Sequence, residues 1–193
     1  MGFCTAPTNR ILLSLLILGC VIYITACNSL GFLQSTPSPA EREAEEYAVY
    51  RAILGEGESC ILSQTIEFKE ISPDEFPELG PKMIEDFNTY RVQTLPLNPN
   101  LDLGGPVTIL SDTELDEIFV DYSHQEWDQF YAQTECTEIV SISRVGFNAQ
   151  MNEALVFYTN VKYAGVGWGR VMLLKKGKDG KWYESEYVIE IEY

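Results

Sequence analysis

The chain has 193 residues, a formal net charge of −16 and 46% hydrophobic residues. A strongly acidic surface repels the phosphates of nucleic acids and the headgroups of anionic lipids, so we expect no nucleic-acid partner. Of the 29 acidic residues, 21 fall within residues 41–128, whereas six of the 13 basic residues fall within residues 162–181. This distribution predicts a solvated acidic half beside a mixed hairpin region, or alternatively a docking surface for a cationic partner or a divalent ion.

An apolar run covers residues 11–24, and Arg10 is the only charged residue before it. The run holds 14 residues, whereas a membrane-spanning helix needs about 20 and the core of a signal peptide has roughly 7 to 15. The next basic residue is Arg42, so no basic flank of the kind found beside stop-transfer helices follows the run. The pattern predicts a cleaved signal peptide over residues 1–26, with an uncleaved single-span anchor or ordinary secretion as alternatives.

The run ends in Ile24-Thr25-Ala26-Cys27, an aliphatic residue, a β-branched one, alanine and then cysteine. This stretch resembles the lipobox of bacterial lipoproteins. The resemblance implies cleavage after Ala26, a diacylglyceryl thioether on Cys27, and an acyl chain such as palmitate on the new amino terminus. Two or more acyl chains hold a protein durably on a membrane. It therefore implies a lipid-anchored protein on the extracytoplasmic face of the cell membrane or outer membrane.

Residues 27–38 are expected to form the lipid-anchored tether, because their composition is small, polar and proline-containing. The stretch Ser38-Pro39-Ala40-Glu41 then has Ser as an N-cap, Pro at the first helical position and Glu at the third. Together with the apolar spacing that follows, it predicts a helix over residues 39–54. Two further helices are predicted, one over residues 81–91 and one that begins at Ser111-Asp112-Thr113-Glu114.

From residue 138 onward the hydrophobic pattern changes to a period of two, which is typical of half-buried strands. Four strands are predicted, over residues 139–145, 154–163, 169–175 and 182–193. In the last of them, one face is expected to be buried and to carry Tyr187, Ile189, Ile191 and Tyr193, while glutamates occupy the other.

Helices first and strands afterwards indicate an α+β fold. We expect one domain over residues 39–193, in which N-terminal helices pack on a C-terminal four-stranded antiparallel meander. A separate short strand is expected within residues 60–68, an irregular loop over residues 94–106, and a helical turn around Trp127, Phe130 and Tyr131.

Four stretches near the C-terminus, SISRVGFN, ALVFY, VMLLKK and GKW, resemble a group of uncharacterised bacterial exported proteins. That resemblance carries no catalytic residues. The closing hairpin also resembles those of cystatin-like and NTF2-like sheets.

Cysteine usage predicts one disulfide. Cys4 and Cys20 leave with the signal peptide and Cys27 is taken by lipid, so that Cys60 and Cys136 remain. An even pair in an exported domain is a candidate bridge, with two buried reduced thiols as the alternative. The bridge is expected to fix the N-terminal helical layer to one edge of the sheet.

Candidate chemistry is sparse. His124, the single histidine, lies between Asp121 and Asp128 and could serve as a general base. Neither a Gly-x-Ser-x-Gly elbow nor a His-Glu-x-x-His motif accompanies it. The acids Asp112, Asp116, Glu117 and Asp121 could offer oxygen ligands to Ca²⁺, but they lack the order and the glycine of an EF-hand, so a charged helix face is the simpler interpretation. We expect no metal and no cofactor.

The sequence thus favours a membrane-anchored binding or scaffolding module that performs no chemistry. Its partners would be the membrane, through the lipid on Cys27, and an unidentified protein or small-molecule ligand. The alternative is a small exported hydrolase that uses Asp121, His124 and Asp128. Replacing His124 by alanine would separate the two classes, because an enzyme would lose turnover by orders of magnitude.

Overall fold

The computed structural model describes residues 37–54, 59–99, 103, 105, 107–121, 123–162 and 166–192. The predicted signal peptide, Cys27 and nearly all of the predicted tether lie outside these ranges. Within the described residues, no helix is both long and apolar enough to cross a membrane.

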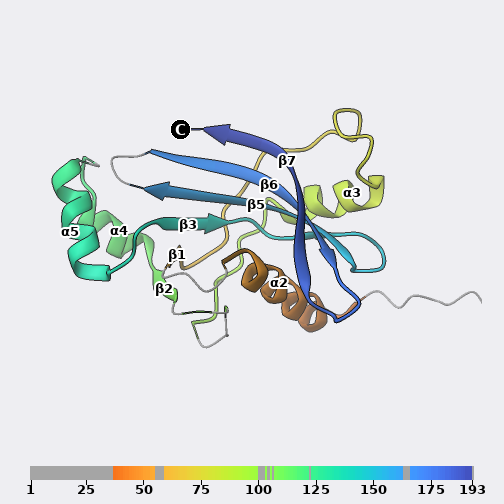
Figure 1. The fold of residues 1–193 in the computed structure, drawn as a ribbon, viewed down its shortest axis with the longest axis horizontal. Helices are drawn as coiled ribbons and strands as arrows, with labels where there is room; N and C mark the ends of the chain where they lie inside the picture. The colour runs from red at the N-terminus through yellow and green to blue at the C-terminus, as the bar shows by residue number, and fades with distance from the viewer. Residues whose placement is uncertain are drawn as a thin grey trace, which may run out of the picture. The chain divides into compact units, whose positions relative to one another are not determined.

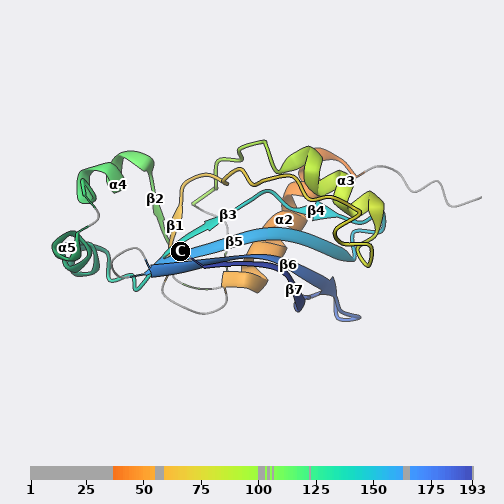
Figure 2. The same cartoon turned by 90° about the horizontal axis from the view of Figure 1, so that it is seen from above.

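Residues Pro39–Tyr193 form one compact unit with four described helices and seven strands. The helices are α2 (Pro39–Leu54), α3 (Pro81–Tyr90), α4 (Asp112–Ile118) and α5 (His124–Thr134). The strands are β1 (Ser59–Leu62), β2 (Val107–Leu110), β3 (Ile139–Ile142), β4 (Gly146–Phe147), β5 (Glu153–Lys162), β6 (Val166–Lys176) and β7 (Trp182–Glu192). Helices α4 and α5 lie at one end of the long strands and α3 lies near the other end (Figures 1 and 2).

The strands form one mixed sheet in the order β2-β1-β3-β5-β6-β7, with β4 paired to β5. β1 runs parallel to both β2 and β3, and the remaining pairs are antiparallel. The α+β prediction is confirmed, but a four-stranded antiparallel meander is wrong as a description of the sheet. The four predicted strands are present as β3, β5, β6 and β7, and the parallel strands β1 and β2 enlarge the sheet beyond them.

The two N-terminal helices cover opposite faces of this sheet. Side chains alternate along β5, so that Val156 packs in the same buried cluster as Tyr50 of α2, while Leu155 packs with Phe87 of α3. Helix α3 approaches the sheet closely at β4. A Cβ built on Gly146 of β4 would lie 2.6 Å from the backbone nitrogen of Phe87 in α3.

The last strand departs from the predicted alternation. Tyr187 lies opposite Met172 and Ile189 lies opposite Val171, with a register shift between the two pairs. Directly opposed residues share a face of the sheet, so the shift places Tyr187 and Ile189 on different faces. Ile189 packs against the α3 cluster, whereas Tyr187 is 48% exposed. The prediction that both residues belong to one buried face is therefore wrong.

A buried ion-pair network joins α2 to the segment after β3. The Glu46 carboxylate is fully buried and accepts hydrogen bonds from Arg144 at 2.7 and 2.8 Å, from Arg42 at 3.2 Å and from the Tyr50 hydroxyl at 3.2 Å. Arg42 also donates to Asp86 of α3 at 2.9 and 3.2 Å. Two arginines and two carboxylates thus neutralise one another where the two helices meet the β3–β4 connection.

Candidate functional site

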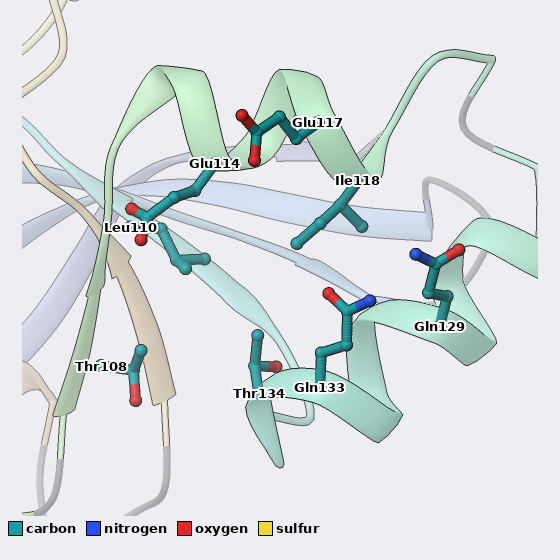
Figure 3. Close-up of a pocket in the computed structure, with 8 residues that line it drawn as sticks. All are labelled: Thr108, Leu110, Glu114, Glu117, Ile118, Gln129, Gln133 and Thr134. Atoms are coloured by element: carbon teal, nitrogen blue, oxygen red, sulfur yellow. The ribbon is translucent and has the colours of Figure 1, made fainter.

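A groove lies between β2, α4 and α5, with a volume of about 560 Å³. Side chains of α4 and α5 face each other across it, and those of β2 close one end (Figure 3). The lining residues are Thr108, Leu110, Glu114, Glu117, Ile118, Gln129, Gln133 and Thr134. Six of the eight are polar, and Leu110 and Ile118 supply an apolar patch.

Capping boxes fix the starts of both helices. The Glu114 carboxylate accepts from the backbone N–H of Ser111 at 2.8 Å, and the Ser111 hydroxyl accepts from the Glu114 N–H at 3.3 Å. In α5, the Glu126 carboxylate accepts from the N–H groups of Ser123 at 2.8 Å and Val120 at 3.0 Å. These bonds satisfy N–H groups that a helix start leaves without partners. The same bonds, those from the Ser111 and Ser123 backbones first, lower the pKa of each glutamate.

An aromatic core packs against Leu110, one of the residues that line the groove. Phe119 packs on Trp127 with ring centroids 4.7 Å apart, and Trp127 packs edge-on to Phe130 at 5.6 Å. These rings form one buried cluster with Leu110 of β2 and with both predicted disulfide cysteines. The aromatic turn predicted from the sequence is therefore a helix that packs against the parallel end of the sheet.

The Cys60–Cys136 disulfide is present, with Cα atoms 5.6 Å apart across a sequence separation of 76 residues. As predicted, Cys60 lies in the strand that follows the first helix, β1, and Cys136 lies just before the first of the four predicted strands, between α5 and β3. The bridge therefore ties the end of the α5 segment to β1, and it does not fix a separate N-terminal helical layer.

The groove carries negative charge and free hydrogen-bonding groups. Residues 111–138 include nine acidic residues and neither lysine nor arginine. Glu114 is engaged in its capping box. Among the described residues, the side chains of Glu117, Gln129 and Gln133 have no hydrogen-bonding partner. One carboxylate and two amides are thus available to a ligand in the groove.

The residues of the hydrolase alternative, Asp121, His124 and Asp128, lie outside this groove. His124 is the first residue of α5 and is exposed, and Asp128 is exposed one turn later on the same helix. Asp121 is exposed between α4 and α5. None of the three lines the groove.

The acids considered for Ca²⁺ are spread along and after α4. Only Glu117 of that group lines the groove. In the part of the chain that the structure describes, no three His, Cys, Asp or Glu residues are arranged to hold a metal ion.

Sequence reasoning missed most of the groove. Thr108, Gln129, Gln133 and Thr134 belong to no recognised motif, because threonine and glutamine side chains are common on any solvated surface. Gln129 and Gln133 lie one helical turn apart and therefore on one face of α5. This spacing predicts a shared face only if the helix is known to extend to residue 134.

No family model, curated protein or solved structure matches the chain.

Proposed function

We propose that the protein is an extracytoplasmic lipoprotein, anchored through Cys27, whose domain binds a partner in the α4–α5 groove. The observation that carries the proposal is the groove itself, which presents unpaired polar side chains over an apolar patch. Binding sites in proteins combine these same two elements, an apolar surface and a small number of placed polar groups.

The disulfide supports the proposed location. Disulfides persist in oxidising compartments outside the cytoplasm and are rare in cytosolic proteins. The bridge between Cys60 and Cys136 accordingly agrees with export directed by the N-terminal apolar run. The lipobox-like stretch that ends at Cys27 supports retention on the membrane after export.

The groove favours a polar ligand with a positive charge. Glu117 supplies an unpaired carboxylate, and the described lining contains no lysine or arginine to neutralise it. Gln129 and Gln133 each offer a donor and an acceptor, which suits a peptide backbone or an amide. Leu110 and Ile118 would contact the apolar part of the same ligand.

Site-specific photocrosslinking tests the proposal on the full chain in its own membrane. Benzoylphenylalanine in place of Gln133 should give a discrete adduct, because this side chain lines the groove. The matched control is Gln125, an exposed glutamine of the same helix outside the groove. A Glu117→Lys change should abolish the Gln133 adduct by reversing the charge of the groove.

Equal adducts at both positions, or none at position 133, would contradict the proposed site. The same assay addresses the hydrolase alternative. His124→Ala should leave the adduct intact if the domain is a binding module, since His124 does not line the groove.

A further inference from the structure

Helices α4 and α5 belong to one excursion of the chain, residues 111–138, which leaves the sheet after β2 and returns to it at β3. Both helices lie at one end of the long strands (Figures 1 and 2). The excursion carries nine acidic residues and neither lysine nor arginine. Because like charges repel one another, the charges within this segment do not help to hold it together.

A single buried cluster packs α5 onto the sheet. Trp127 and Phe130 of α5 lie in this cluster with Leu110 of β2. The hydrogen bonds at the end of α5 are local, since the Thr134 hydroxyl donates to the Phe130 carbonyl at 2.9 Å and accepts from the Cys136 N–H at 3.2 Å. Apolar packing therefore carries much of the attachment of α5 to the sheet.

The disulfide adds a covalent link to the same cluster. Cys136 lies two residues after the end of α5, Cys60 lies in β1, and both belong to the cluster. The elements that line the groove, β2, α4 and α5, all lie between the two cysteines in the chain. Closing this loop removes conformations of the reduced chain in which the end of α5 lies away from β1. The bridge thus favours the arrangement that forms the groove.

We propose that formation of the Cys60–Cys136 bridge assembles the α4–α5 groove, so that the domain gains its binding site only after oxidation. This inference rests on the proposed role of the groove as a binding site. In the reduced chain, the excursion detaches from the sheet as a local unit, while the long strands β5 and β6 stay paired.

The oxidation needs a partner and runs in one direction. The thiols of Cys60 and Cys136 lose two electrons and two protons as the S–S bond forms, and a protein disulfide outside the cytoplasm accepts them and becomes a dithiol. In the folded domain Cys60 is 0% exposed and Cys136 is 3% exposed. The finished bridge is therefore shielded from soluble thiols, and the groove stays assembled.

Hydrogen exchange of the full chain in nanodiscs tests the assembly step. Oxidised wild type is compared with wild type that has been unfolded with a reductant and refolded in the reduced state, so the two forms differ only in the S–S bond. Amides of α5 should exchange about tenfold faster or more in the reduced form, whereas amides of β5 and β6 should keep their rates. Glu46→Ala is the matched control, because it weakens the domain where α2 meets Arg144 and should not open α5 ahead of β5.

Crosslinking through benzoylphenylalanine at position 133 reports on the groove itself. A chain with both Cys60→Ala and Cys136→Ala should lose the adduct that the oxidised chain gives. Unchanged α5 exchange in the reduced form, equal acceleration of α5 and β5, or an adduct that survives in the double variant would overturn the proposal. Faster α5 exchange in a protein that gives no adduct even when oxidised would support the assembly step and contradict the proposed function instead.

Discussion

Glu46 shows how the fold tolerates a buried charge near its centre. Its carboxylate is fully buried and accepts from Arg42, Arg144 and Tyr50. Within the described residues, the hydrogen bonds of the Arg144 side chain go to Glu46, whereas Arg42 has Asp86 as a second partner. Removing Glu46 would therefore leave Arg144 as a nearly buried cation without its carboxylate.

Glu46→Ala is expected to destabilise the domain by about 3–5 kcal/mol, the usual cost of breaking a buried ion pair from one side. Glu43→Ala on the same helix is the control, since Glu43 is exposed and its removal should change stability by less than about 0.5 kcal/mol. Urea unfolding of both variants gives the comparison. Equal midpoints would show that the network contributes nothing to stability.

The capping glutamates give the protein a defined response to acid. The pKa of Glu126 is lowered from its ordinary value of 4.5, above all by the Ser123 N–H. A carboxylate with a lowered pKa in the folded state stabilises that state above its unfolded pKa and ceases to do so as the pH falls through the folded value. Glu126→Gln should accordingly be less stable than the wild type at pH 7, and the gap should close below pH 4.5. Urea-unfolding midpoints of both proteins at several pH values measure this difference in stability. A difference that does not change with pH would contradict the role of the charge.

At the scale of elements, the contact between α3 and β4 depends on one residue without a side chain. A Cβ on Gly146 would meet the backbone of Phe87, and neither backbone can yield cheaply. Gly146→Ala should therefore cost about 1–3 kcal/mol through overpacking. Gly80→Ala, at the N-cap of α3, is the matched control, because a Cβ there meets nothing within 4 Å. Thermal unfolding should separate the two variants clearly, and similar midpoints would mean that α3 can shift away from the sheet.

The elements that the sequence predicted well are those with local signals. Helix α2 spans the predicted residues 39–54, and α4 begins after the predicted cap at Ser111. The start of α4 depends on side chains within four positions of the backbone groups that they satisfy. The same pattern occurs in Ser123 and Glu126, so the start of α5 was also readable and was missed.

The parts that escaped prediction depend on distant partners. β2 has four residues between a loop and a helix start, and only its parallel pairing with β1 makes it a strand. That pairing in turn brings Thr108 and Leu110 to the groove, beside side chains of α5. No spacing in the sequence encodes this contact, and hence the groove could not be predicted even though the start of α4 was.

For the molecule as a whole, the uneven charge of the sequence persists on the folded surface. The described lining of the groove between α4 and α5 has two carboxylates and neither lysine nor arginine, whereas the turn between β6 and β7 carries Lys178, Asp179 and Lys181.

Anchoring is the property of the whole molecule that is tested most directly. Cys27 supplies the thiol that the proposed diacylglyceryl group requires, and serine cannot form the same thioether. We therefore predict that Cys27→Ser abolishes incorporation of labelled palmitate and leaves a precursor that retains residues 1–26. Cys20→Ser is the matched control, because Cys20 lies within the predicted signal peptide and its loss should leave palmitate incorporation unchanged. The mass of the wild-type membrane form decides the matter. If that form still includes residues 1–26, the segment is an uncleaved anchor and the lipoprotein proposal is wrong.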